Sequence, residues 1–318
     1  MSKKLFLLLT SVLTLSVQVT AQQDPLLTHF IFNKMSFNPA ATGSEDGFIG
    51  TSVYRNQWDK IDGAPNSAIL NLEGNMSRFF PGGLGLSFFH DAIGFNRQNN
   101  LMLNYSYPIK ISTTDELRLG LGVGMLNFGM KPNWVTSDPG TFDKSLPTAF
   151  SSTGLDLNFG IYYKSAKNFY AGLSVTHING SEIKHQTELN NVTFNQLYPI
   201  HRHLYVMGGY TTRKIGPGKI DTQMLLRSEL NLASVDINAR YIVEKYGYAG
   251  LTYRSSDAIA IMLGYTPTTV PNFTIGYSYD ITTNKLSNVS RGSHEILLRY
   301  CYYLPIPPLE ISRHPRWL

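Results

Sequence analysis

The segment 116–130, ELRLGLGVGMLNFGM, alternates strictly between large apolar side chains and small or polar ones. Every second residue from Leu117 to Met125 is Leu, Val or Met, and the residues between them are Arg or Gly. Because successive side chains of a β-strand point to opposite faces, this period of two predicts a strand with one apolar face. Such a face can lie against a soluble core or against lipid. The same alternation returns later and earlier in the chain, in 101–109, 235–243, 273–281 and 295–303.

Repetition of this pattern decides the fold class. We predict about fourteen strands of about ten residues each, and nothing between them has the period of a long helix. Since lipid tolerates no open sheet edge, an even number of such strands predicts an all-β fold, a transmembrane antiparallel β-barrel. The alternative is a large soluble β-sandwich. The predicted strands are 47–57, 67–76, 83–91, 98–109, 116–130, 154–164, 168–177, 202–212, 219–229, 232–243, 246–254, 257–266, 271–281 and 294–303.

Loop lengths give this barrel a predicted orientation. The long connections 131–153, 178–201 and 282–293 all follow odd-numbered strands of the series, whereas short ones such as 164–167 and 244–246 follow even-numbered strands. Outer-membrane barrels have long loops outside the cell and short turns in the periplasm. We therefore expect the long loops at the cell surface and both termini in the periplasm.

The N-terminus predicts export. Lys3 and Lys4 precede the apolar run Leu5–Val19, and Val19-Thr20-Ala21 offers the small residues of a signal cleavage site. The run of about 15 apolar residues is shorter than the roughly 20 that cross a bilayer as a helix, so a membrane anchor is disfavoured. The predicted parts are a signal peptide (1–21), an N-terminal segment with a short helix or turn (22–46), an outer-membrane barrel (47–303) and a periplasmic C-terminal tail (304–318).

The segment 22–44 does not alternate. Asp24 is a suitable N-cap for a helix whose first residue is Pro25, and Asn38-Pro39 would end it. The predicted element is a short amphipathic helix. Two interpretations stay open: the helix packs its apolar face against the barrel, or it plugs the lumen or docks a partner at the periplasmic mouth. The apolar stripe consists of Leu27, Phe30 and Ile31.

Composition excludes several classes of function. The net charge of +5 is small, and the basic residues are scattered without any nucleic-acid-binding motif, so no nucleic acid is expected as a partner. Cys301 is the only cysteine, which excludes an intrachain disulfide. The 19 Tyr and 17 Phe suit the aromatic girdles of a membrane barrel.

No catalytic or metal-binding arrangement is predicted. His201 and His203 lie on one face at the start of a strand, but no ligand set with metal spacing accompanies them. The run GLGVG lies inside an alternating strand and does not open a helix, and a Gly-x-Ser-x-Gly elbow is absent from the sequence. We therefore expect no enzyme activity, cofactor or metal. The further histidines considered as ligands are His90 (beside Asp91), His177 and His185.

The polar faces of the strands predict a lumen of mixed charge. Arg227 and Glu229 on one strand should face Asp236 and Arg240 on the next as a cross-strand ladder. Mutual neutralisation is favoured over a selective pore, because a selectivity filter concentrates one sign of charge. The residues expected inside are Arg118, Asp156, Arg227, Glu229, Asp236, Arg240, Arg254, Asp280, Glu295 and Arg299.

Motifs in the first third of the chain resemble a known family. They are Gln23-Asp24-Pro25, Asn38-Pro39-Ala40, Gln57-Trp58, the run Ile61–Pro65, and Asp91 after a Gly-rich strand. In this order after a signal peptide they resemble the PorP/SprF family, outer-membrane proteins of type IX secretion and gliding motility in Bacteroidetes. Two departures, Ala41-Thr42 in place of Tyr-Ala and Lys60 in place of Gly, affect details of the turns.

The resemblance implies an accessory outer-membrane barrel that supports export or surface retention of specific secreted or adhesin proteins. Its implied partners are other type IX secretion components and the C-terminal domain of a secreted protein, in addition to the lipid bilayer. The alternative function is a diffusion or substrate-selective channel, which a barrel of about fourteen strands could accommodate. The candidate partner-binding residues are Gln23, Asp24, Pro25, Phe30, Asn38, Pro39, Trp58, Asp62, Gly63 and Pro65.

Overall fold

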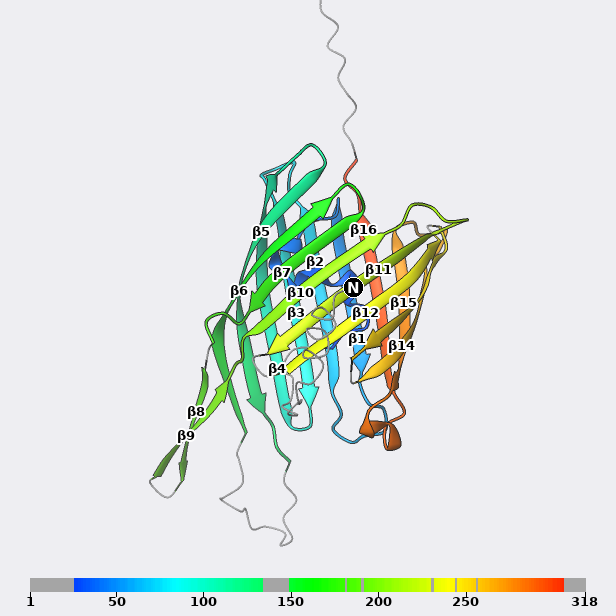
Figure 1. Cartoon of the computed structure of the whole chain (residues 1–318). Helices are drawn as coiled ribbons and strands as arrows, with labels where there is room; N and C mark the ends of the chain where they lie inside the picture. The colour runs from blue at the N-terminus through cyan, green and yellow to red at the C-terminus, as the bar shows by residue number, and fades with distance from the viewer. Residues whose placement is uncertain are drawn as a thin grey trace, which may run out of the picture.

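Fourteen antiparallel strands close into a single barrel (Figure 1). The computed structural model describes residues 26–133, 149–180, 182–189, 192–229, 232–243, 245–255 and 257–305. The barrel strands are β1 (Phe48–Asn56), β2 (Asn66–Asn75), β3 (Gly83–Ile93), β4 (Asn96–Lys110), β5 (Asp115–Met130), β6 (Phe150–Ser165), β7 (Phe169–Thr176), β10 (His203–Thr211), β11 (Lys219–Glu229), β12 (Leu232–Val243), β13 (Gly247–Arg254), β14 (Ala258–Tyr265), β15 (Phe273–Thr282) and β16 (Ser293–Tyr302).

Closure of the barrel comes from β1, which pairs with β2 on one side and with β16 on the other. Phe48 lies opposite both Gly74 and Tyr302. Every barrel strand therefore has two partners, as a sheet immersed in lipid requires. The predicted fold class is confirmed, and each of the fourteen predicted strands overlaps one observed strand.

The alternation read from the sequence is the alternation of exposure in the structure. On β5, Leu121, Val123 and Met125 are 60%, 52% and 62% exposed, while the glycines that alternate with them, Gly120, Gly122 and Gly124, face the lumen. An outward face of bare Leu, Val and Met side chains is suited to acyl chains and would be costly in water. Among the described residues, no helix is long and apolar enough to span a membrane.

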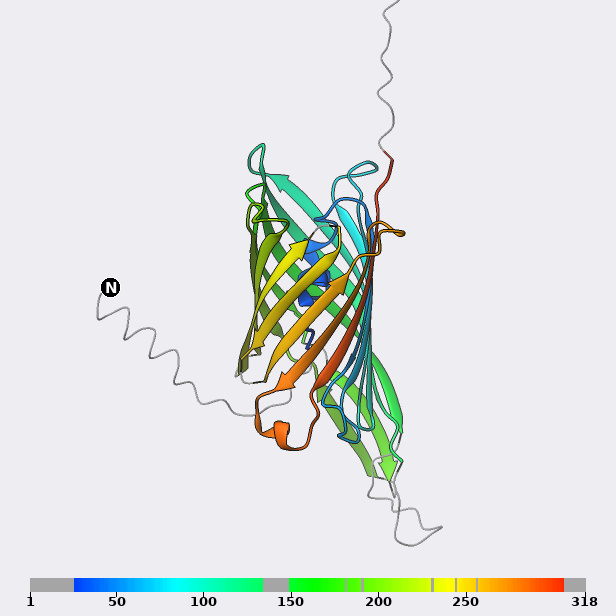
Figure 2. The same ribbon diagram turned by 90° about the vertical axis from the view of Figure 1, so that its right-hand side faces the viewer.

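One pair of strands was not predicted. The connection 178–201 contains a hairpin, β8 (Glu182–Leu189) and β9 (Val192–Pro199), which forms a separate two-stranded sheet. Figures 1 and 2 show that it projects beyond the barrel at the end that also carries the β1–β2 and β15–β16 connections. We call this the long-loop end, and the opposite end, where β16 finishes, the short-turn end.

The N-terminal segment lies inside the barrel. Residues 26–44, which we call the plug, form three short helical turns: η1 (Phe30–Phe32), α2 (Lys34–Phe37) and η2 (Pro39–Ala41). The predicted short helical segment is confirmed and lies in the lumen, but it consists of three turns and not of one continuous helix, because Asn33 and Asn38 interrupt it. The Asn38 side chain accepts a hydrogen bond from the Ala40 N–H at 2.9 Å, which starts a new turn in place of continuing the old one.

The two ends of the barrel predict a topology that surface labelling can test. An epitope inserted after Leu189, beside the tip of the β8–β9 hairpin, is expected to bind antibody on intact cells. An epitope inserted after Pro217, in the short β10–β11 turn, should bind only after the outer membrane is permeabilised, because short turns face the periplasm in this architecture. Labelling of intact cells at Pro217 alone would invert the orientation.

Candidate functional site

The plug begins at a buried cluster of charges on the barrel wall. Glu295 of β16 accepts hydrogen bonds from the backbone N–H groups of Thr28 and His29, at 2.9 and 2.7 Å, and its carboxylate lies 2.7 Å from His29 Nδ1. The Thr28 hydroxyl donates to Asp280 of β15 at 2.8 Å. Arg55 of β1 bridges both carboxylates, at 3.1 Å from Glu295 and 2.7 Å from Asp280. We call these five residues the latch.

The latch continues around the wall as a row of alternating charges. Arg254 lies 3.2 Å from both Asp280 and Asp236, and Arg227 lies 2.5 Å from Asp236. Removing one partner from a buried, hydrogen-bonded charge pair costs about 3–5 kcal/mol, because the remaining charge stays buried without compensation. The wall charges therefore neutralise one another and bind the first residues of the plug.

The other end of the plug packs directly against glycines on the lumen face. A Cβ atom built on Gly120 of β5 would lie 2.1 Å from the Ala40 nitrogen, and one on Gly160 of β6 would lie 2.0 Å from Asn38 Oδ1. The Asn38 side chain donates to the Ile161 carbonyl at 3.0 Å across this contact. The backbone of η2 thus lies directly on the wall, and only residues without a side chain fit beneath it.

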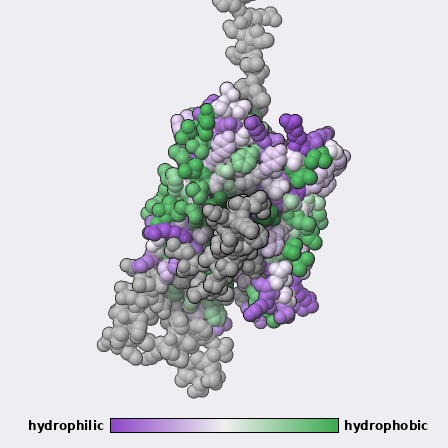
Figure 3. All heavy atoms as spheres, in the orientation of Figure 1, coloured by the Kyte–Doolittle hydropathy of each residue, from purple (hydrophilic) through white to green (hydrophobic). Residues whose placement is uncertain are grey.

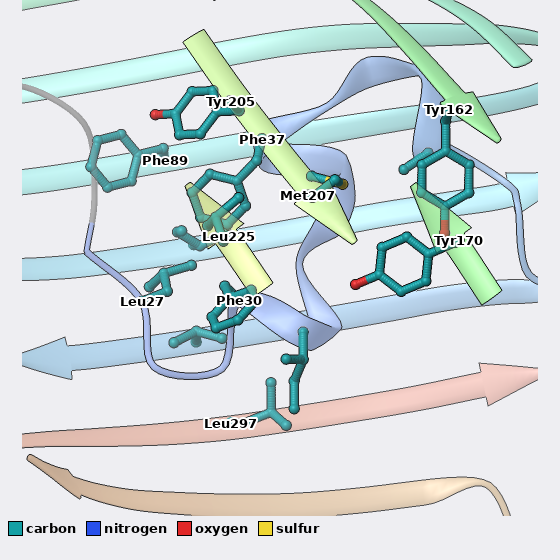
Figure 4. Close-up of a cluster of buried hydrophobic side chains, with 14 of the residues drawn as sticks. Leu27, Phe30, Phe37, Phe89, Tyr162, Tyr170, Tyr205, Met207, Leu225 and Leu297 are labelled. Atoms are coloured by element: carbon teal, nitrogen blue, oxygen red, sulfur yellow. The ribbon is translucent and has the colours of Figure 1, made fainter. Parts of the chain in front are cut away.

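Packing and further hydrogen bonds fix the rest of the plug. Arg118 and Ser106 donate to the Thr42 carbonyl at 3.1 and 2.6 Å. Between the latch and the glycines, apolar plug side chains pack against the inner wall in one buried cluster (Figure 4). The plug is therefore bound along its length and fills the lumen at this level. The labelled members of the cluster include Leu27, Phe30, Phe37, Tyr205, Leu225 and Leu297.

The predicted charge ladder is partly wrong in its partners. Arg227 pairs with Asp236 as expected, but Arg240 pairs with Asp221 at 2.9 Å and Glu229 pairs with His203. The register explains the difference, since Asp221 lies directly opposite Arg240 and His203 directly opposite Glu229. The expectation that charges on the lumen face satisfy one another holds with these corrected pairs.

The histidines considered as metal ligands have other contacts. His203 pairs with Glu229, and His177 Nδ1 lies 2.8 Å from Asp156. The two rings meet edge to face with centroids 5.7 Å apart. In the described part of the chain, no three His, Cys, Asp or Glu side chains converge as metal ligands would.

Three connections at the long-loop end form one hydrogen-bonded surface. Asp59 of the β1–β2 loop donates its N–H to the Gly292 carbonyl at 2.8 Å, and its own carbonyl accepts from Arg291 at 3.0 Å. On the other side, the Gly63 carbonyl accepts from the N–H of Gly94, in the β3–β4 turn, at 2.8 Å. We call this surface, residues 57–65, 93–95 and 283–292, the rim.

The rim has a fixed shape and a mixed surface. Trp58 and Lys60 have positive φ angles of 54° and 73°, a backbone conformation that persists in such residues when its surroundings impose it. Ile93 and Val289 are 45% and 62% exposed, and the charged residues Lys60 and Asp62 of the rim are exposed as well. Rigid surfaces that combine apolar and charged groups are suited to binding a protein partner.

The structure separates the predicted partner-binding residues into three groups. Trp58, Asp62, Gly63 and Pro65 lie on the rim. Phe30, Asn38 and Pro39 are buried within the plug, where they contact the barrel and present no surface to a partner. The remaining three, Gln23, Asp24 and Pro25, lie outside the described residues.

Comparison with known proteins agrees with this architecture. The profile of a family described as type IX secretion system membrane protein PorP/SprF matches residues 19–300. The chain belongs to this family. The match runs from before the plug to the last barrel strand, so plug and barrel are both part of the PorP/SprF unit. A search of curated proteins finds no match.

Solved structures share the fold. The CymD monoaromatic hydrocarbon channel is 12% identical with a TM-score of 0.50, and the alignment covers 86% of this chain and 93% of that one. The toluene transporter TbuX of Ralstonia pickettii is 11% identical with the same TM-score and coverage. At this identity the likeness concerns the fold alone. The family is described as a secretion component, and the two solved structures are described as a channel and a transporter. None of these descriptions is that of an enzyme.

Proposed function

We propose that this PorP/SprF protein is an outer-membrane accessory component of type IX secretion that acts by binding other proteins. Its partners are other secretion components and the C-terminal domain of a secreted or adhesin protein, whose export or surface retention it supports. The rim is the proposed binding surface, with Trp58, Asp62, Gly63 and Pro65 as its central residues.

The observation that carries this proposal is the bound plug. A barrel whose lumen is occupied by residues 26–44, with buried ion pairs at one end and direct backbone contact at the other, offers no free passage to a folded or extended polypeptide. The rim, in contrast, is exposed and held by hydrogen bonds between three connections. A function at the surface of the barrel is therefore favoured over one through its lumen.

The alternative function is a diffusion or substrate-selective channel. The shared fold with hydrocarbon channels is compatible with it, but the plug would have to move for any solute to pass. Purified protein in planar bilayers distinguishes the two functions. Steady current through the unmodified protein would favour the channel, and absence of current is expected for the proposed role.

A charged residue on the rim is expected to abolish partner binding without affecting the barrel. Ile93→Glu places a carboxylate in the exposed apolar part of the rim, where an interface would have to bury it unpaired. We expect at least a tenfold loss of co-purifying secretion components, with a parallel loss of the surface-displayed secreted protein.

The matched control is Ile215→Glu, which changes an equally exposed isoleucine (50%) in the short β10–β11 turn. Both variants should show the heat-modifiable gel migration of a folded barrel. Equal loss of partners from both variants, or no loss from either, would contradict the assignment of binding to the rim.

A further inference from the structure

A groove crosses the outer face of the barrel near the short-turn end. It lies over β16, β1, β2 and β3 and has a volume of about 440 Å³, which falls in the range of small-molecule sites, roughly 300–1,000 Å³. Gly50 places no side chain here, so the groove is lower than the surrounding wall, while the Phe48 ring packs over Gly74. Figure 3 shows hydrophobic residues along the flanks of the barrel. The side chains around this groove include Phe48, Leu72, Leu84, Leu86, Tyr300 and Tyr302.

A positive charge, that of Arg78, lies beside the short-turn end of this groove, two residues after the lining residue Met76. Arg78, in the β2–β3 turn, donates hydrogen bonds to the carbonyls of Leu304 and Pro305, at 3.3 and 2.9 Å. Leu304 follows β16, and β1 lies between β16 and β2. The Arg78 side chain therefore reaches from the end of β2 past the end of β1, and these three strands all border the groove.

The charge of Arg78 is available to a ligand. Both of its acceptors are neutral carbonyls, and within the described residues no carboxylate lies at ion-pair distance from it. The neighbouring Phe79 and Phe80 are 69% and 41% exposed. Exposed aromatic rings beside a cation are typical of the headgroup level of a membrane. An apolar groove that ends at a cation matches an amphiphile with an anionic head.

We propose that the groove binds one anionic phospholipid of the leaflet at the short-turn end. One acyl chain lies over Gly50, and the phosphate accepts hydrogen bonds from Arg78. The position of the groove on the face that contacts acyl chains favours a lipid over a soluble ligand. The recess distinguishes this lipid from its neighbours, because a chain within it contacts wall atoms on several sides.

Native mass spectrometry with added dioleoylphosphatidylglycerol tests the proposal. The unmodified protein in mild detergent is expected to retain one lipid per chain under activation that removes all others. Gly50→Leu should lose this lipid, since the new side chain fills the groove. A Cβ atom on Gly50 would meet only Leu72 Cδ2, at 3.4 Å, so the wall itself should accommodate the change.

Gly208→Leu is the matched control. Gly208 lies on the outward face of β10, away from the groove, and a Cβ there would meet only the Tyr170 carbonyl oxygen at 3.6 Å. This variant should keep the lipid. Heat-modifiable migration establishes that both leucine variants have folded, and Gly50→Ala provides a smaller change in the same groove, with partial loss expected.

The headgroup contact is tested separately. Arg78→Gln is expected to weaken retention of dioleoylphosphatidylglycerol about fivefold, the effect of removing one cation near an anionic headgroup, and to leave retention of uncharged dioleoylglycerol unchanged. Retention of the phospholipid by folded Gly50→Leu at the level of the unmodified protein would overturn the proposal. So would a continuous distribution of bound lipids on the unmodified protein, without a preferred single one.

Discussion

Glu295→Ala is expected to open the lumen of a correctly assembled barrel. Without this carboxylate, the N–H groups of Thr28 and His29 lose their acceptor in a fully buried position, and Arg55 keeps only Asp280 of its two carboxylate partners. A loss of about 3–5 kcal/mol is expected from breaking such a pair. Because the latch joins the plug to the wall, this energy is lost from docking of the plug. The measurement is single-channel current in planar bilayers, where the unmodified protein should be silent and the variant conducting.

Two further variants distinguish release of the plug from general damage. Asp257→Asn changes another carboxylate of the wall, which pairs with Arg254 at 3.4 Å. Asp257 does not contact the plug, so this variant should remain silent. Gly120→Leu forces a side chain against Ala40 at the other end of the plug and should conduct. Silence of both Glu295→Ala and Gly120→Leu in folded barrels would show that the plug is held by neither contact.

Leu121→Arg is expected to impair assembly of the barrel itself. Leu121 is 60% exposed near the middle of β5, on the face assigned to lipid. A cation near the bilayer midplane destabilises a membrane barrel by about 2–4 kcal/mol, which lowers the equilibrium ratio of folded to unfolded protein about thirtyfold or more. The measurement is the ratio of folded to unfolded protein on unheated gels. Leu121→Phe, which keeps the site apolar, should assemble normally, and equal assembly of both variants would contradict the assigned lipid face.

The strands were predictable because the pattern that produces each strand lies within its own segment of the sequence. A lipid-facing wall requires an apolar residue at every second position, and this requirement is written into each strand independently of the others. The segment around Leu121 contains its own evidence of which face meets lipid. Antiparallel connection of neighbouring strands then follows from the short loops, so both the fold class and the order of the strands could be predicted.

The candidate site was less predictable because its contacts join distant parts of the chain. Glu295 and His29 are 266 residues apart, and nothing near either residue identifies the other. A partial signal for the plug did exist on the lumen face of β5, where Gly120, Gly122 and Gly124 repeat: a Cβ atom on Gly120 would meet Ala40 of the plug, whereas one on Gly122 or Gly124 would meet residues of the neighbouring strands. On sequence alone a serine at Gly122 looks harmless, but a Cβ there would lie 2.5 Å from Asn104 Oδ1. Such a stripe of glycines indicates that something lies close to the wall.

The joining of three connections in the rim, and the β8–β9 hairpin, were missed for a different reason. The turn motif around Gly63 predicted a loop, but its hydrogen bonds to Gly94 and Gly292 depend on the closure of the barrel, which brings three separate connections together. The hairpin could not be told from a long polar loop, since the sequence of β8, EIKHQTEL, contains only two large apolar residues, Ile183 and Leu189.

The latch also determines at which stage of folding the plug can dock. Thr28 and His29 precede the first strand, yet their acceptors Asp280 and Glu295 lie on the last two strands. The N-terminal residues are synthesised first, but their binding site exists only after the chain has been completed almost to its end and β16 has paired with β1. A truncated or stalled chain therefore leaves its N-terminus unbound. An ordered plug marks a barrel that has finished folding.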